Sequence, residues 1–361
     1  MININKLTIT PEILSIISEI DEFKGSWKAF KVLSPERLIE LKKVATIESI
    51  GSSNRIEGNK LSDKDVEALL SRIDRTSFTS RDEEEIAGYA VLMDTLFDHF
   101  EVIPFTENYI KQLHGILLKY SHKDEAHRGE YKKLSNSVAA YDPDGKQLGI
   151  IFETTTPFET PAQMRECVDW IRTTLADGAL HPILAIGIFV VTFLAIHPFQ
   201  DGNGRLSRAL TTLLLLQSGY AYVPFSSIEA IVENNKEGYY RALRQTQSTF
   251  KTELDYEPWI LFFLRTLQAH KRHLEQKIKG INDQLSTLTA LSEQIMKLFD
   301  KNERITLSFV AESTNANINT IKKHLAELAS SGYITKHGHT RGAWYVKTPP
   351  TETTFLPGFR G

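Results

Sequence analysis

The chain has 361 residues, of which 41% are apolar and 24% charged, a composition typical of a folded protein rather than a disordered or fibrous one. At about 150 residues per domain, this length predicts two to three domains. Lysine and arginine number 42 against 45 acidic residues, so the net charge of −3 does not indicate a polyanionic partner. The only cysteine, Cys167, excludes an intrachain disulfide framework and a cysteine-based zinc site.

The N-terminal sequence lacks the basic, apolar and small-residue segments that make up a secretory signal. The longest apolar run, Ile183 to Ile196, has 14 residues. That is short of the about 20 residues that span a bilayer, and it is typical of a buried helix. We therefore expect a cytoplasmic protein with no membrane partner, in which this run is the central helix of the main domain.

Three helices are predicted in the first third of the chain. A serine, a proline and an acid at 34–36 have the form of a helix start, and Gly58 ends that helix. Ser62, with Asp65 three residues later, predicts a second helix that starts with a capping box. The acidic cluster at 82–85 opens a third helix, because acids stabilise a helix N-terminus.

The pattern changes between residues 135 and 160. A turn-forming sequence at 141–145 separates β-prone segments at 138–141 and 150–156, which predicts a β-hairpin. A polar stretch around 278–288 is the predicted linker. Helical periodicity between the hairpin and the linker covers 163–175, 183–196, 206–217, 236–247 and 257–279.

The strongest indication of a functional site lies at 197–208. An apolar helix stops at His197, because the residue before Pro198 is driven out of the helical region. Two glycines then lead into a new helix, whose first backbone N–H groups can bind an anion such as phosphate. Arg205 and Arg208 share one face of its first turn, where a cation opposes the helix dipole by about 0.3–1 kcal/mol. We therefore expect an anion beside them.

Two more side chains of this segment indicate chemistry. Asp201 can hold Mg²⁺ through one carboxylate together with phosphate oxygens. His197 is placed to act as a general base near neutral pH, and Phe199 is expected to point into the core. Taken singly, each residue would more often be structural. Their combination within twelve residues favours a nucleotide site.

This segment resembles the signature of the Fic family, H-x-F-x-[D/E]-G-N-G-R-x-x-R. All eight specified positions match: His197, Phe199, Asp201, Gly202, Asn203, Gly204, Arg205 and Arg208. The resemblance implies a mainly α fold, in which an all-helical core with a β-hairpin flap carries the motif between two central helices. It also implies transfer of AMP from ATP to a Ser, Thr or Tyr hydroxyl of a target protein or of the chain itself.

The resemblance implies a role for each motif residue. His197 would deprotonate the target hydroxyl, and Asp201 would hold Mg²⁺. Gly204 favours adenylylation, because related toxins that phosphorylate their target carry lysine at this position. The residues implied to bind ATP are Gly202, Asn203, Gly204, Arg205 and, at the γ-phosphate, Arg208.

A second motif lies upstream of the core. Glu57 falls at the C-terminal end of its predicted helix, where the dipole repels a carboxylate. It is therefore either simply exposed or paired with a cation. The segment from Ser53 to Gly58 resembles the Fic inhibitory motif, [S/T]-x-x-x-E-[G/N]. This resemblance implies that Glu57 pairs with Arg208 in place of the γ-phosphate and autoinhibits the enzyme.

Looser similarities surround the motif. The hairpin resembles the flap on which Fic proteins dock a target by β-augmentation, so we expect an unidentified target protein along 150–157. Lys132 stands where an arginine is frequent. Residues 238–243 resemble the segment beside the nucleoside, so Tyr240 is expected to bind ATP, with Gln247 as a further candidate. Core packing is an equal alternative for the tyrosines.

Residues 289–347 predict a separate small domain. Three short helical patterns followed by two strands resemble a winged helix-turn-helix. Eight basic against five acidic residues between 285 and 350 are a mild bias toward DNA, and protein contacts are an equal alternative. The polar face of the third helix would carry Asn319, Thr320, Lys322 and Lys323.

The predicted domains are an N-terminal helical region with the inhibitory helix at 1–84, the Fic core with trailing helices at 85–278, the winged helix-turn-helix at 289–347 and a tail at 348–361. The leading function is an autoinhibited protein adenylyltransferase that uses ATP and Mg²⁺. The alternative is a DNA-binding transcriptional regulator in which the Fic core only senses nucleotide. A homodimer is left open.

Overall fold

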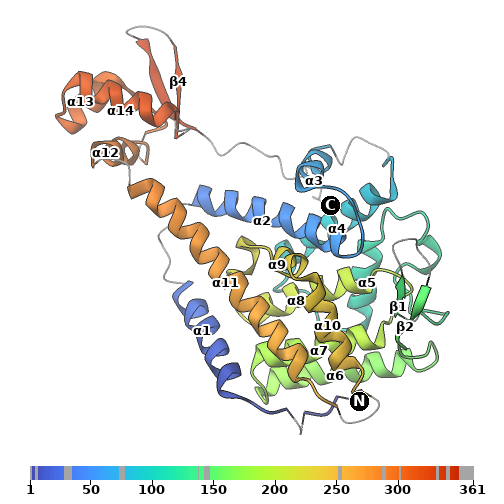
Figure 1. Cartoon of the computed structure of the whole chain (residues 1–361). Helices are drawn as coiled ribbons and strands as arrows, with labels where there is room; N and C mark the ends of the chain where they lie inside the picture. The colour runs from blue at the N-terminus through green and yellow to red at the C-terminus, as the bar shows by residue number, and fades with distance from the viewer. Residues whose placement is uncertain are drawn as a thin grey trace. The chain divides into compact units, whose positions relative to one another are not determined.

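The chain forms two compact units, Met1–Leu274 and Glu275–Gly361, in a computed structural model (Figure 1). Both units are mainly α, as predicted. The predicted hairpin tip at 142–145 and most of the predicted tail lie outside the described residues. The structure describes 2–4, 7–27, 35–72, 78–136, 138–141, 147–250, 254–286, 290–300, 302–330, 333–338 and 342–348.

Four helices build the first part of the larger unit. Helix α1 (Pro11–Trp27) has no counterpart among the predicted helices and buries an apolar stripe that includes Ile13, Ile20 and Phe23. The other three confirm their predicted starts. Helix α2 covers Pro35–Ile56, and Gly58, two residues later, turns the chain with φ of 103°. Helix α3 covers Asp63–Leu70 and starts with the Ser62–Asp65 capping box. Helix α4 covers Arg81–His99 and is capped by Ser80.

The predicted hairpin is present, with a shorter and earlier second strand. Strand β1 (Val138–Tyr141) pairs antiparallel with β2 (Gln147–Phe152), and Val138 faces Phe152 in the register. The prediction of a strand continuing to residue 156 is wrong, because β1 offers no partner beyond Val138. The side chain of Thr154 instead bonds to Asn136, the residue two before β1.

The core of the larger unit is built around α7 (Pro182–Ile196), in which every residue from Ile183 to Ile196 is buried. It packs against α6 (Thr160–Asp177) and α8 (Asn203–Gln217). In the part of the chain that the structure describes, each helix is too short or too polar to cross a bilayer. The remaining helices of this unit are α5 (Glu107–Leu117), the short η2 (Glu125–His127) and η3 (Val223–Phe225), α9 (Ile228–Asn234) and α10 (Lys236–Gln247).

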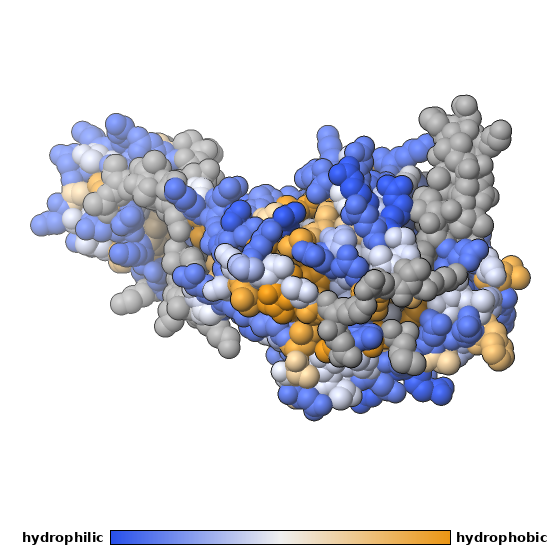
Figure 2. Space-filling view, turned by 60° about the horizontal axis from the view of Figure 1, so that its bottom comes forward, coloured by the Kyte–Doolittle hydropathy of each residue, from blue (hydrophilic) through white to orange (hydrophobic). Residues whose placement is uncertain are grey.

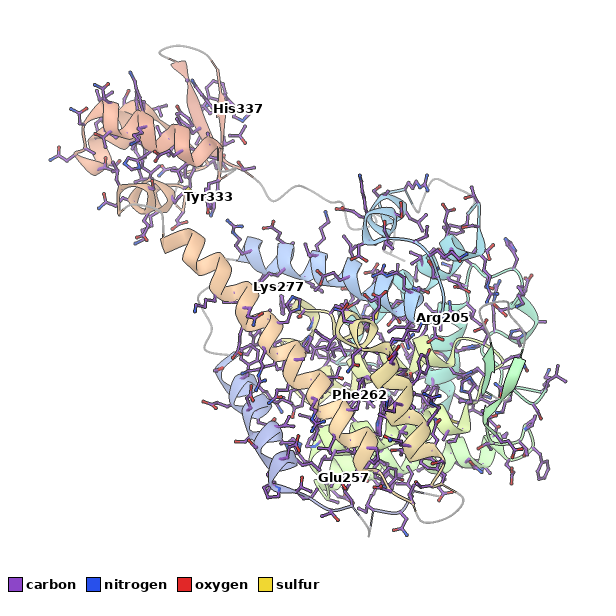
Figure 3. All side chains as sticks on the ribbon, viewed as in Figure 1. Arg205, Glu257, Phe262, Lys277, Tyr333 and His337 are labelled. Atoms are coloured by element: carbon purple, nitrogen blue, oxygen red, sulfur yellow. The ribbon has the colours of Figure 1, made fainter. Side chains whose placement is uncertain are left out.

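The long helix α11 (Glu257–Ser286) corrects the predicted linker at 278–288. The helix continues to Ser286 although Gly280, Asn282 and Asp283 are poor helix formers, so local propensity does not predict where it ends. Figure 3 marks the course of this helix by Glu257, Phe262 and Lys277. Near its start, the Trp259 indole N–H donates to the carbonyl of Gly187 at 2.7 Å and joins α11 to α7.

After the end of α11, the described residues of the smaller unit form three helices and three strands. They are α12 (Ala290–Leu298), β3 (Arg304–Thr306), α13 (Leu307–Thr314), α14 (Ile318–Ser330), β4 (Ile334–His337) and β5 (Trp344–Lys347). The strands form an antiparallel sheet in the order β3-β5-β4. Strand β3 is absent from the prediction because three residues are too few to show a period of two. The arrangement is consistent with the predicted winged helix-turn-helix.

The core of this smaller unit uses the apolar residues that the sequence pattern singles out. One buried cluster contains Ile295 of α12, Ile321, Leu325 and Leu328 of α14, and Ile334 of β4.

Figure 2 shows one face of the molecule, on which apolar residues lie in patches among mostly polar ones.

Two helical glycines give a matched test of this packing. A Cβ on Gly88 of α4 would overlap the carbonyl of Leu117, whereas a Cβ on Gly25 of α1 meets nothing within 4 Å. We expect Gly88→Ala to lower the free energy of unfolding by about 1–3 kcal/mol. Gly25→Ala should be neutral or raise it by up to about 1 kcal/mol. Urea denaturation followed by circular dichroism measures both, and equal effects of the two variants would contradict the packing.

Candidate functional site

The motif residues form a tight loop between α7 and α8. His197 ends α7 in the left-handed conformation, with φ of 52°, and its N–H donates to the Phe193 carbonyl at 2.8 Å. Gly202, with φ of 80°, precedes α8. The Asn203 side chain closes the loop, because it accepts from the N–H of Phe199 at 2.9 Å and donates to the Phe199 carbonyl at 2.7 Å. Both polar atoms of the Asn203 side chain are therefore used to hold the loop, and Asn203 itself is the first residue of α8.

His114 of α5 supports this loop from below, and no sequence motif points to it. Its ring stacks on Phe199 with centroids 3.8 Å apart. Nδ1 accepts from the N–H of Gly129 at 2.9 Å, so Nε2 carries the proton and donates to the Asp201 carbonyl at 3.0 Å. Burial lowers the pKa of His114 to about 4 and keeps the ring neutral. Phe199 is fully buried, as expected.

Lys132 and Asn136 join the loop to the base of the hairpin. Lys132 Nζ donates to the Ile196 carbonyl at 3.0 Å, to Asn136 Oδ1 at 2.7 Å and to Thr154 Oγ1 at 2.8 Å. Asn136 Nδ2 donates to the Phe199 carbonyl at 2.6 Å. Burial lowers the pKa of Lys132 to about 8. The sequence shows only that Lys132 replaces a common arginine, and these bonds give it a structural role at the end of α7.

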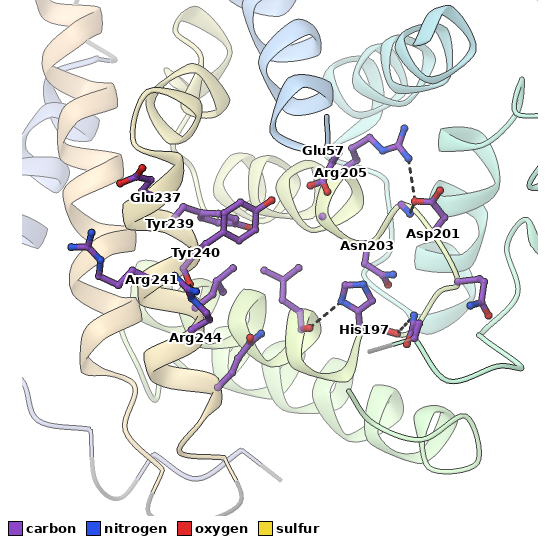
Figure 4. A pocket seen from close by; sticks show the side chains of 17 residues that line it. Glu57, His197, Asp201, Asn203, Arg205, Glu237, Tyr239, Tyr240, Arg241 and Arg244 are labelled. Carbon is purple, nitrogen blue, oxygen red and sulfur yellow. Dashed lines mark hydrogen bonds and ion pairs between the residues drawn. The ribbon is translucent and has the colours of Figure 1, made fainter. Parts of the chain in front are cut away.

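A cavity of about 800 Å³ lies above the loop (Figure 4). One wall comes from His197 and the start of α8, and the opposite wall comes from α10. In Figure 4, Tyr240 and Arg244 lie across the cavity from His197 and Asp201. The lining residues are Glu57, Asn136, Leu194, His197, Gln200, Asp201, Gly202, Asn203, Gly204, Arg205, Glu237, Tyr239, Tyr240, Arg241, Leu243, Arg244 and Gln247.

The His197 ring is oriented by the last turn of α7. Its Nδ1 lies 3.3 Å from the Leu194 carbonyl and is therefore assigned as the protonated nitrogen, which leaves Nε2 as an acceptor. Burial lowers the pKa of His197 to about 4 against the opposing effect of the Leu194 carbonyl, and the Lys132 charge lowers it further. The ring is neutral at pH 7 and can accept a proton.

Arg205 and Asp201 belong to a cluster of four charges. Arg205 is 2% exposed and lies 3.4 Å from both Asp201 Oδ1 and Glu85 Oε2. Arg81, at the start of α4, lies 3.0 Å from Asp201 Oδ2 and 2.8 Å from Glu85 Oε1. Burial raises the pKa of Asp201, but Arg205, the Gly202 N–H and Arg81 outweigh it and hold this pKa below its ordinary value. Arg81 and Glu85 are site residues that the sequence reasoning missed.

Arg208 has its own acidic partner. Its Nη2 donates to Glu57 Oε1 at 2.8 Å and to the Ser53 carbonyl at 2.8 Å, while Nε donates to Ser53 Oγ at 2.9 Å. Ser53 is fully buried, and Gly58 turns the chain just after Glu57. A Cβ at Gly204 would overlap the Glu57 carboxylate, so a larger residue there would force this carboxylate to move. The structure thus brings Ser53, Glu57 and Arg208 together.

The arrangement fits a polyphosphate. Arg205 Nε and Arg208 Nη1 are buried and have no hydrogen-bond partner among the described residues. Helix α8 has no side-chain cap at Gly202, and its first residues line the cavity, so N–H groups of its first turn are available to a ligand there. Buried donors without acceptors are costly, and phosphate oxygens would satisfy them.

The residues also fit Mg²⁺ held partly by its nucleotide. In the ranges described, no group of three or more His, Cys, Asp or Glu side chains is arranged to hold a metal. Asp201 is the acid of the motif loop and lines the cavity. One carboxylate completed by phosphate oxygens and water is the usual protein environment of Mg²⁺.

The two tyrosines of α10 differ in their surroundings. Tyr239 packs in T-shaped contact against Trp259, with ring centroids 5.8 Å apart, and belongs to the core. Tyr240 lines the cavity, and its hydroxyl lies 3.4 Å from the Ile56 carbonyl at the end of α2. Gln247 also lines the cavity. Both tyrosines line the cavity, but Tyr239 is also packed into the core, so Tyr240 is the one with more of its ring open to a ligand.

Comparison with known proteins identifies the middle of the chain. Residues 104–215 match the family described as Fic/DOC family. A protein named "Protein adenylyltransferase Fic" from Drosophila willistoni is 27% identical over 263 residues, which are 71% of this chain and 48% of that protein. The chain thus spans about half the length of this relative.

Solved structures show the same fold. A Fic family protein from Desulfovibrio desulfuricans aligns with a TM-score of 0.60 at 22% identity, over 94% of this chain and 97% of that one. A Fic domain containing signaling protein from Bacteroides thetaiotaomicron aligns with a TM-score of 0.58 at 27% identity, over 73% of this chain and 97% of that one.

Proposed function

Because residues 104–215 are a Fic domain, we propose that this protein transfers AMP from ATP to a Ser, Thr or Tyr hydroxyl of a target protein or of itself. The observation that carries this proposal is one cavity that combines a neutral His197 with the buried Arg205, an uncapped helix start and Glu57, the acid that holds the buried Arg208. A base and an anion site in the same cavity are what nucleotidyl transfer to a hydroxyl requires.

In this proposal the start of α8 holds the phosphates. The backbone N–H groups of Gly202, Asn203 and Gly204 bind the α- and β-phosphates, Arg205 adds charge, and Arg208 binds the γ-phosphate. Asp201 would hold Mg²⁺, which neutralises phosphate charge when bound. Tyr240 would line the adenine side of the cavity, with Gln247 beside it.

The chemical step is a displacement at the α-phosphorus. His197 Nε2 accepts the proton of the target hydroxyl as its oxygen forms the new P–O bond, and pyrophosphate leaves. Positioning and charge neutralisation contribute most in such reactions. The target would dock along the hairpin at 150–157, and only the part up to Phe152 is strand that could pair with it.

We further propose that Glu57 autoinhibits this activity. Its carboxylate occupies a donor of Arg208 that the γ-phosphate would need, at 2.8 Å. Ser53 holds the same guanidinium through two more bonds. ATP bound with Glu57 in place would have its γ-phosphate displaced, and the α-phosphorus would no longer face His197 and the target.

Removal of the Glu57 carboxylate is the test of this function. A charge-assisted hydrogen bond is worth about 1.5–3 kcal/mol, so Glu57→Gly should raise AMP transfer roughly ten- to a hundredfold. The measurement is label incorporated into protein from α-³²P-ATP in a cell lysate, followed by mass spectrometry of the modified proteins. Label from γ-³²P-ATP instead would indicate a kinase and contradict the proposal.

Two control variants sharpen this assay. Glu101→Gln removes an exposed acid outside the cavity, and it should leave activity within about twofold. The double variant Glu57→Gly with His197→Ala should lose the label. Retention of label without His197 would refute its role as the base.

The pH dependence of the activated variant tests the state of His197. A histidine of ordinary pKa, near 6.5, would lose its basic form as the pH falls from 8 to 6. With a pKa of about 4, His197 remains neutral over this range. We therefore expect kcat/KM of Glu57→Gly to be flat from pH 8 to 6 and to fall only as the pH approaches 4. A half-maximal rate near pH 6.5 would contradict the burial of this ring.

The smaller unit supports a second function, DNA binding, through one observation. Asn319, Thr320, Lys322 and Lys323 are all exposed on α14, next to a fully buried Ile321. We propose that this face contacts DNA, which would make the protein a regulator whose Fic domain senses nucleotide.

Charge reversal on α14 tests this second function. In the full chain, the double variant Lys322→Glu with Lys323→Glu should weaken binding to duplex DNA by about tenfold or more in a mobility-shift assay. Lys64→Glu, on the exposed side of α3, serves as the control. Absent binding, or binding that salt does not weaken, would contradict a role in DNA recognition.

A further inference from the structure

Four charged side chains form a closed ring beside the phosphate site. Arg81 contacts Asp201 at 3.0 Å, Asp201 contacts Arg205 at 3.4 Å, Arg205 contacts Glu85 at 3.4 Å, and Glu85 returns to Arg81 at 2.8 Å. Cations and anions alternate around the ring, so its formal charge is zero. The ring is complete without a metal or a nucleotide.

The two arginines of this ring differ in their freedom to move. Arg205 is 2% exposed and is fixed in the first turn of α8, whereas the Arg81 side chain is 48% exposed at the start of α4. Arg81 also has Glu85 one turn along its own helix, at 2.8 Å. If Arg81 released Asp201, it would still be paired with Glu85, because residues at i and i+4 are neighbours on one face of a helix.

The two oxygens of Asp201 have different partners. Oδ1 accepts from the Gly202 N–H and lies near Arg205, and both of these groups are part of the motif loop. Oδ2 accepts from Arg81, which comes from 120 residues earlier in the chain. A cation that binds Asp201 without disturbing the loop would therefore take Oδ2, the oxygen that Arg81 holds.

We infer that Arg81 is a resident cation that holds Asp201 before Mg²⁺ arrives and competes with Mg²⁺ for the same oxygen. This inference rests on the proposed function, because it requires Asp201 to be the carboxylate that holds Mg²⁺. Arg81 acts through Asp201 and is a positioning residue. It gives Oδ2 of Asp201 a cationic partner, and it raises the Mg²⁺ concentration that nucleotide binding requires.

The competition is independent of the Glu57 contact. Arg81 touches Asp201 and Glu85, whereas Glu57 touches Arg208. Arg81–Asp201 thus acts on the side of the metal, and Glu57–Arg208 acts on the side of the γ-phosphate.

The test measures binding rather than activity. All variants are made in the full chain with Glu57→Gly, and calorimetry gives the Kd of α,β-methylene-ATP in EDTA and in saturating Mg²⁺. The Kd in EDTA divided by the Kd in Mg²⁺ gives the factor by which Mg²⁺ tightens nucleotide binding. We expect Arg81→Gln to increase this ratio by about three- to tenfold, with equal or tighter binding in Mg²⁺.

Three further variants serve as controls. Arg72→Gln removes another exposed arginine that pairs with α4, at Glu83, and should leave the ratio unchanged. Arg81→Lys keeps the charge but lacks the planar guanidinium fork, so its ratio should lie between those of the parent and Arg81→Gln. Asp201→Asn should bring the ratio close to one.

The possible results separate the inference from the proposed function. An unchanged ratio in Arg81→Gln would overturn the inference while leaving the metal role of Asp201 intact. Weaker binding of Arg81→Gln in Mg²⁺ would also overturn it, and would show that Arg81 binds phosphate. A parent ratio of one, unaltered by Asp201→Asn, would overturn both the metal role of Asp201 and the inference.

Discussion

The site depends on two arginines buried at the positive end of a helix. Arg205 is 2% exposed in the first turn of α8 and Arg208 is 7% exposed in the second, near the helix end where the dipole disfavours a cation. Burial of unpaired charge is far more costly than the dipole itself, so acids must lie next to them. Asp201 and Glu85 meet Arg205, and Glu57 meets Arg208. Phosphate would satisfy the same donors, so a nucleotide and these acids are alternative partners.

Such competition requires a loop that keeps its shape when its partners change. Asn203, His114, Lys132 and Asn136 hold the backbone of residues 196–201 by bonds to carbonyl and N–H groups. None of these bonds uses the charged side chains of Arg205, Arg208 or Asp201. One set of residues therefore positions the phosphate-binding N–H groups, and another set, the acids Asp201, Glu85 and Glu57, balances the charge of the two arginines.

The sequence predicts the parts of this site that lie close together in the chain. The proline and glycines of 197–204 determine where α7 stops and α8 starts, and Gly58 determines where α2 ends. The partners of the loop come from distant elements, such as His114 on α5 and Arg81 on α4. Nothing in the local pattern of a single sequence marks such residues, because only the packing of helices brings them near. The same reason explains the second strand of the hairpin, which ends where its partner ends rather than where β-prone residues do.

Gly204 lies in the phosphate loop and also leaves the space that the Glu57 carboxylate occupies, so phosphate binding and autoinhibition both depend on this one position. Any larger residue there would occupy the space of the Glu57 carboxylate. A substitution that alters the phosphate loop at this position would therefore also release Arg208 from Glu57. A larger residue at 204 thus changes the phosphate loop and forces the Glu57 carboxylate to move, so a single substitution acts on both the phosphate site and the contact that holds Arg208.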